Sequence, residues 1–125
     1  MNKELCFIID KRKLYLEKVL VEYNDIPIFY LCRSEEEYYL VLCSNIEEEK
    51  YIIVKPAKLE VLDMLNGELA MRDIILHQES FWEVSAGEDI SQDRVEIKPI
   101  DQIEYEALPY ENTFYEIPSP DMEEY

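Results

Sequence analysis

The sequence predicts an α+β fold, an antiparallel sheet of about five to six strands with one or two helices packed on one face. Two observations lead to this prediction. Short runs of aromatic, β-branched and aliphatic residues recur between polar turns, as strands do. Two other stretches, 56–67 and 71–76, place apolar residues at helical spacing instead.

The first part of the chain predicts a hairpin. Residues 1–10 contain a short apolar run that fits either a strand or one helical turn. The basic triplet 11–13 follows and is expected to be a solvated connection. Residues 14–23 predict a long strand, and the turn Asn24-Asp25 returns the chain into a second strand over 26–32.

The central hairpin comes next and leads into a helix. The runs 38–43 and 51–54 are too short for free-standing helices, and the loop 44–50 between them is polar. Pro56 suits the first turn of a helix, where its missing amide hydrogen would have no partner. An apolar stripe predicts the buried face of this helix and consists of Leu59, Leu62 and Leu65, with Val61 beside them.

The remaining elements are shorter. Residues 71–76 predict a second helix with Met71, Ile74 and Ile75 on one face. Residues 80–85 have strand character and carry the only tryptophan. After a turn at Gly87-Glu88-Asp89, residues 94–98 alternate polar and apolar side chains, which predicts a half-buried strand.

The composition changes at Pro99, so we predict one domain over 1–98 and an acidic C-terminal tail over 99–125. No Lys or Arg follows Lys98. The dipeptide Tyr-Glu recurs every five residues, at Tyr105, Tyr110 and Tyr115. This recurrence fits coincidence, an aromatic acidic tail that lies in a basic groove of a partner, or a strap across the domain's own sheet that uses Leu108, Phe114 and Ile117.

Charge is the strongest compositional feature. Twelve Lys and Arg stand against 29 Asp and Glu, a formal net charge of −17. Such a surface repels nucleic acid and anionic membranes, so direct binding to either is not expected, whereas a basic protein partner is. No segment approaches the roughly 20 apolar residues of a membrane span, and three cysteines in apolar runs predict reduced thiols in the cytoplasm.

Two glutamate triplets flank the central hairpin and should lie at opposite ends of the sheet. They are either solvated loop tips or contacts for separate basic patches of one partner. With the three tyrosines they form the candidate partner-binding set: Glu35, Glu36, Glu37, Glu47, Glu48, Glu49, Tyr105, Tyr110 and Tyr115.

Residues for catalysis are scarce. The only histidine, His77, ends the second predicted helix, where a surface or capping role is expected. The cysteines lack the spacing of zinc ligands, and two glycines leave no phosphate-binding loop. We therefore predict no catalytic residues, metal or cofactor, and no enzyme.

Several runs resemble a family of small acidic bacterial proteins of Gram-positive hosts whose activity is uncharacterised. They are Tyr38-Tyr39-Leu40-Val41-Leu42-Cys43, Tyr51-Ile52-Ile53-Val54-Lys55, Leu62-Asp63-Met64-Leu65-Asn66-Gly67-Glu68 and Met71-Arg72-Asp73, within residues 14–84. The family often has Thr or Ser before the second helix, where this chain has Ala70. The resemblance implies a single α+β domain from bacteria or their mobile elements and brings no active site.

Three functional classes follow. The first is a non-enzymatic acidic inhibitor of a basic protein, such as a nuclease or another nucleic-acid-binding protein, of the immunity or anti-defence type and including nucleic-acid mimicry. The second is a constitutive subunit or adaptor of a larger bacterial complex that offers an edge strand or helix face. The third is a small carboxylate-based enzyme. The oligomeric state is left open.

Overall fold

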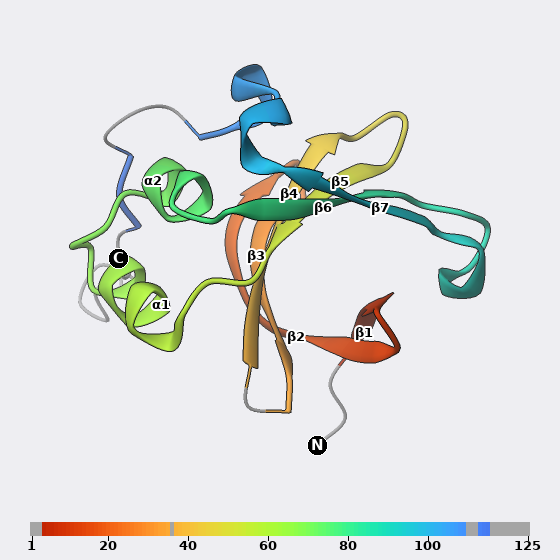
Figure 1. The fold of residues 1–125 in the computed structure, drawn as a ribbon, viewed down its shortest axis with the longest axis horizontal. Coiled ribbons are helices and arrows are strands. Elements are labelled where there is room, and N and C mark those ends of the chain that lie inside the picture. Colours follow the sequence, from red (N-terminus) through yellow and green to blue (C-terminus); the bar gives the residue numbers. More distant parts are fainter. Residues whose placement is uncertain (1–3, 36, 110–112, 116–125) are drawn as a thin grey trace.

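The computed structural model describes residues 4–35, 37–109 and 113–115 (Figure 1). The strands are β1 (Leu5–Ile9), β2 (Arg12–Tyr23), β3 (Ile26–Ser34), β4 (Glu37–Asn45), β5 (Lys50–Val54), β6 (Ser80–Ser85) and β7 (Arg94–Pro99). The helices are α1 (Lys58–Leu65) and α2 (Met71–Leu76), with short 3₁₀ turns η1 (Ile90–Gln92), η2 (Ile100–Gln102) and η3 (Tyr105–Ala107).

All seven strands form one antiparallel sheet in which each strand pairs with its neighbours in sequence. The prediction of five to six strands was too small, because the run that fitted either a strand or a helical turn forms the edge strand β1. β1 turns into β2 through Asp10 and Lys11, whose φ angles are 51° and 71°. Two-residue hairpin turns with positive φ usually have the sequence Asn-Gly, so the dipeptide Asp-Lys did not indicate a turn at this place. The fold is mostly β, with two short helices.

The sheet curls into a half-barrel (Figure 1). β2 is twelve residues long, and its register against β3 shifts at three places. Register shifts of this kind bend a strand and increase its twist. As a result, the rings of Phe7 on β1 and Tyr51 on β5 lie 5.2 Å apart between centroids, although three strands separate β1 from β5 in the sheet. The face that carries these rings is the inside of the half-barrel.

The core has two parts, one on each face of the sheet. The inner cluster fills the half-barrel and consists of Phe7, Ile9, Leu14, Tyr30, Cys32, Tyr39, Val41, Ile53 and Val84. The outer cluster packs the opposite face of the sheet against both helices. Its sheet members are Phe29, Leu31, Leu40, Leu42, Ile52, Val54 and Phe81.

The two helices differ in how well the sequence predicted their buried faces. α2 buries Met71 and the two isoleucines that follow, as predicted. α1 buries Val61 and Met64, whereas Leu59 and Leu62 are 68% and 46% exposed. The predicted apolar stripe was therefore wrong at these two leucines. α1 has only about two turns, and both the leucine stripe and the stripe one position before it, with Val61 and Met64, are apolar. Contact with the sheet buries the second of these stripes.

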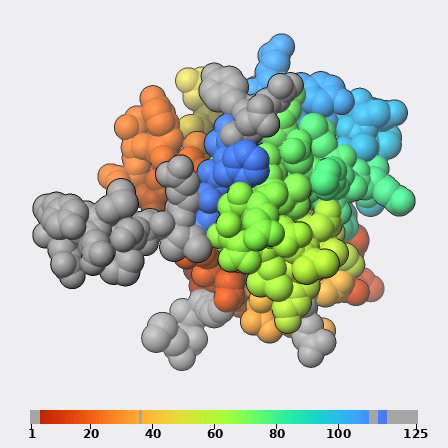
Figure 2. Space-filling model, turned by 90° about the vertical axis from the view of Figure 1, so that its left-hand side faces the viewer, coloured from red at the N-terminus to blue at the C-terminus, as the bar shows by residue number. Residues whose placement is uncertain are grey.

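The chain beyond β7 returns to the helix-covered face. Ile103 and Leu108 belong to the outer cluster and are 4% and 6% exposed. The amide of Met71 donates to the carbonyl of Thr113 over 3.0 Å. Figure 2 shows the last described residues, in blue, seated against the light-green helix. The described part of 99–115 therefore contributes side chains to the core.

Candidate functional site

The described members of the first glutamate triplet are Glu35, in the turn after β3, and Glu37, the first residue of β4. Glu35 is exposed with a φ of 55°, and its carbonyl accepts a 2.8 Å hydrogen bond from Nε of Arg33. Glu36 lies outside the described residues. Glu37 pairs with Arg12 and with Lys55, whose Nζ lies 2.6 Å from Oε2. The hydrogen bond from Lys55 and the nearby Arg12 charge hold the pKa of Glu37 below its ordinary value. Its charge is therefore already compensated within the chain.

The second triplet lies in the β4–β5 loop, at the other end of β4, and all three side chains are exposed. The amide of Glu48 donates to Oδ1 of Asn45 over 3.0 Å, and its carboxylate lies 3.5 Å from Nζ of Lys50. Among the described residues, no lysine or arginine pairs with Glu47 or Glu49. This loop therefore presents uncompensated negative charge to solvent.

The β6–β7 connection forms a second acidic loop beside the β4–β5 loop. Strands β5 and β6 are paired so that Lys50 faces Ser85, and the amide of Ala86 donates to the carbonyl of Glu49 over 3.0 Å. Burial raises the pKa of the Tyr51 phenol, and the nearby charges of Cys43, Glu49 and Asp93 add to this effect. We call the combined surface the acidic end, and it consists of Glu47, Glu48, Glu49, Glu88, Asp89 and Asp93.

The contribution of the β6–β7 connection to this surface was not predicted from the sequence. Glu88 and Asp89 were assigned only to a turn. Asp93 caps that turn, because its Oδ1 accepts a 2.9 Å hydrogen bond from the amide of Gly87. The signal was available in the strand order, since pairing of β5 with β6 brings the two connections to one end of the sheet.

Two of the three candidate tyrosines, Tyr105 and Tyr115, lie in the part of the chain that the structure describes. Tyr105 is 54% exposed, and the guanidinium of Arg72 lies 5.6 Å from its ring centroid. Tyr115 is half-buried against the outer cluster, with Nζ of Lys18 5.7 Å from its ring centroid. Tyr110 lies outside the described residues. The two described rings thus contact cations of their own chain.

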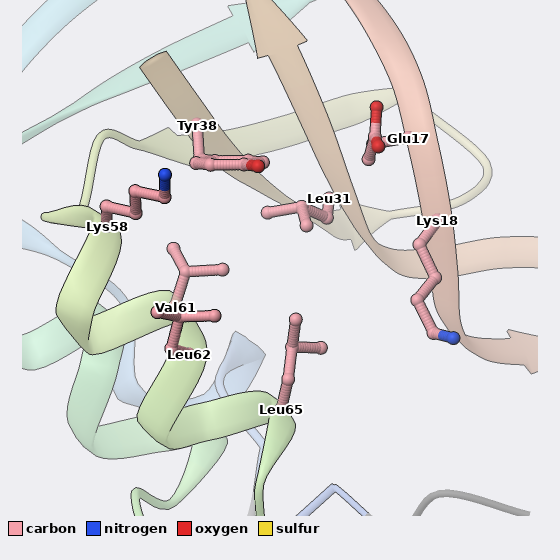
Figure 3. Close-up of a pocket in the computed structure, with 8 residues that line it drawn as sticks. All are labelled: Glu17, Lys18, Leu31, Tyr38, Lys58, Val61, Leu62 and Leu65. Atoms are coloured by element: carbon pink, nitrogen blue, oxygen red, sulfur yellow. The ribbon is translucent and has the colours of Figure 1, made fainter. Parts of the chain in front are cut away.

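A groove lies between β2 and α1 (Figure 3). Its volume is about 280 Å³, and Leu31, Val61 and Leu65 give it an apolar lining. Figure 3 shows Tyr38 and Lys58 on one side of the space and Lys18 on the other. An apolar lining with polar groups at the edge suits an apolar side chain of another molecule better than it suits chemistry.

Nδ1 of His77 lies 3.6 Å from Oε2 of Glu60, between the helices and far in sequence from any cysteine. Within the described ranges no group of three or more His, Cys, Asp and Glu side chains is arranged to hold a metal ion. All three cysteines are free thiols. The acidic end presents exposed negative charge and the groove an apolar lining, so both are candidate binding surfaces.

Two further findings concern the length of the helices and the similarity of the chain to known proteins. Neither α1 nor α2, nor any other helix in the described residues, has the length and apolar character needed to cross a membrane. Comparison of the chain with models of protein families, with curated proteins and with solved structures finds no match.

Proposed function

We propose that this chain is a non-enzymatic module that binds a basic protein through its acidic end. The acidic end itself carries the proposal, because it places six carboxylates on two adjacent loops and only Lys50 and Arg94 stand near them in sequence. The paired strands β4 to β7 hold the ends of both loops at one end of the sheet, so the two groups of carboxylates are brought together before a partner arrives.

The expected partner is a cytoplasmic protein that binds nucleic acid, such as a nuclease. A net charge of −17 accelerates encounter with a positive surface and repels nucleic acid itself. Occupying a groove that otherwise holds phosphates would block that partner, which is inhibition of the immunity or anti-defence type. The resemblance to acidic bacterial proteins agrees with this setting.

The test is capture of partners on the full chain, with two variants that change the charge equally. One neutralises the acidic end through Glu47→Gln, Glu49→Gln, Glu88→Gln and Asp89→Asn. The control neutralises four exposed carboxylates elsewhere through Glu22→Gln, Glu68→Gln, Asp101→Asn and Glu106→Gln.

The proposal expects that mass spectrometry identifies a basic nucleic-acid-binding protein, that the acidic-end variant loses it, and that the control retains it. Binding should also weaken steeply as salt rises, because exposed charges act through screened fields. Retention by the acidic-end variant at high salt would overturn the proposal.

The exposed apolar surface of α1 favours a second candidate function, that of a subunit or adaptor. Leu62 lines the groove of Figure 3, and both Leu62 and Leu59, which precedes it by three residues on α1, are exposed. Apolar contacts are insensitive to salt, so a partner held there would survive high salt and the acidic-end substitutions. It would be lost from a chain with Leu59→Asp and Leu62→Asp, and that pair of results distinguishes the two functions.

A further inference from the structure

A pocket lined by two cations, one carboxylate and two aromatic side chains lies where the β1–β2 hairpin meets the inner face of the sheet. Its volume is about 220 Å³, and its lining residues are Ile9, Asp10, Arg12, Tyr39, Lys55 and Trp82. Ile9 and Tyr39 are buried, so two of its walls are fixed by the core. Sites for drug-sized ligands usually have about 300–1,000 Å³, so this pocket suits a small molecule that remains partly in solvent.

Two cations converge at the pocket on one carboxylate. Arg12 is the first residue of β2, and Lys55 directly follows β5. Each of them pairs with a different oxygen of Glu37. Nη1 of Arg12 also lies 3.5 Å from the hydroxyl of Tyr39, which is 2% exposed. A guanidinium and an ammonium on one oxyanion are the groups that proteins use to hold phosphate or carboxylate, and the Tyr39 hydroxyl contacts only the guanidinium. Glu37 does not line the pocket itself, but its carboxylate contacts the two cations that do, and an anionic ligand would have to take its place on them.

The other side of the pocket is aromatic. The rings of Tyr39 and Trp82 are 6.0 Å apart between centroids, at an angle of 51°. Arg12 meets the hydroxyl of Tyr39 and Trp82 meets its ring, so the cations and the indole are separated by about one tyrosine side chain. A ligand that reaches both must carry its negative group and its flat ring on a short spacer, as a ribose does in a nucleotide.

We propose that this pocket binds a nucleoside monophosphate, whose phosphate replaces the Glu37 carboxylate between Arg12 and Lys55 while its base lies against Trp82. Glu37 then competes with the ligand for the two cations. Removing this carboxylate should strengthen binding, by roughly three- to tenfold if the exposed pairs have ordinary strength. A purely structural ion pair predicts no such gain. The inference does not depend on the partner of the acidic end.

Trp82 is the only tryptophan in the chain and reports binding directly. Its emission is titrated with adenosine monophosphate, inorganic phosphate and adenosine, excited at the red edge of the indole band where adenine does not absorb. The proteins are the full chain, Glu37→Gln, and Glu37→Gln combined with Arg12→Gln and Lys55→Gln. Lys58→Gln in the Glu37→Gln chain is the control, because it removes an exposed lysine that does not line this pocket. Circular dichroism checks that each variant is folded.

We expect adenosine monophosphate to bind Glu37→Gln more tightly than it binds the natural chain, and more tightly than inorganic phosphate or adenosine binds. The triple variant should lose this binding, and the control should retain it. The proposal is overturned if adenosine monophosphate changes the emission of neither the natural chain nor Glu37→Gln. It is also overturned if the triple variant binds as well as Glu37→Gln does, or if inorganic phosphate binds as tightly as the nucleotide.

Discussion

Replacing Leu108 by alanine tests whether the chain after β7 is part of the folded core. Leu108 follows η3, is 6% exposed and belongs to the outer cluster, with α2 and β4 close by. Leu→Ala substitutions in cores cost about 2–5 kcal/mol, and the cost is lower where neighbours can collapse into the space. Leu108 lies near the surface on a short 3₁₀ turn, so we expect a loss of about 2–3 kcal/mol in the free energy of unfolding.

That loss is a large fraction of the total stability of a domain, which is about 5–15 kcal/mol. With the usual unfolding entropy per residue, it lowers the Tm of a chain of 125 residues by about 8–12 °C. Urea denaturation followed by circular dichroism gives the free energy, and a thermal scan gives the Tm. Both use the full chain.

Leu59→Ala is the matched control, because it removes the same atoms from a side chain that is 68% exposed. Exposed substitutions change stability by about 0.5 kcal/mol or less. If Leu108→Ala costs no more than Leu59→Ala, the packing of this segment against the helices is wrong. A chain ending at Lys98 extends the test, since it removes Ile103 together with Leu108 and should unfold at much lower urea concentration.

Three further predictions concern the turns, the charges and the thiols. Lys11→Gly should raise the free energy of unfolding by about 0.5–1 kcal/mol, because glycine adopts the positive φ at this position without steric cost; destabilisation in urea would contradict the turn geometry. The pKa of Glu37 is lowered in the folded chain, so its ion pairs stabilise the fold above the carboxylate pKa of the unfolded chain and are lost as pH falls through the folded value. Thermal unfolding of Glu37→Gln should therefore depend less on pH in the acidic range, and equal pH dependence in both chains would argue against the pairing. A hydrogen bond from Cys32 lowers the pKa of the partly exposed Cys6 thiol, whereas burial raises that of Cys43. Iodoacetamide followed by peptide mass spectrometry should thus find Cys6 modified first, and earlier modification of either other cysteine would disagree.

The central strands and turns were predictable because their signals are local. The turn Asn24-Asp25 and the strand Ser80–Ser85 appear where the sequence placed them. The curl of the sheet was not predictable, because it depends on which residues of β2 are skipped in pairing with β3. Alternation of apolar residues shows which side chains share a face but not where a bulge interrupts the ladder.

The candidate site was predicted in part for the same reason. Exposure of Glu47 and Glu49 follows from a polar loop, which is local information. Compensation of Glu37 depends on Arg12, which is 25 residues away and comes near it through the pairing of β2 with β3 and of β3 with β4. Burial of Ile103 was not predicted, and packing of Leu108 was only one of three alternatives for the tail, since isolated apolar residues among acidic ones lack a helical or strand period.

The strand order has a consequence for how the chain folds. Because every strand pairs with its sequence neighbours, most of the sheet forms through short loops, whose closure costs little entropy. The sheet can therefore grow from β1 toward β7 while the chain is still emerging from a ribosome. The outer cluster cannot be completed in this way, because Ile103 and Leu108 are synthesised after every strand. We expect nascent chains to remain sensitive to protease until these residues have left the ribosomal tunnel.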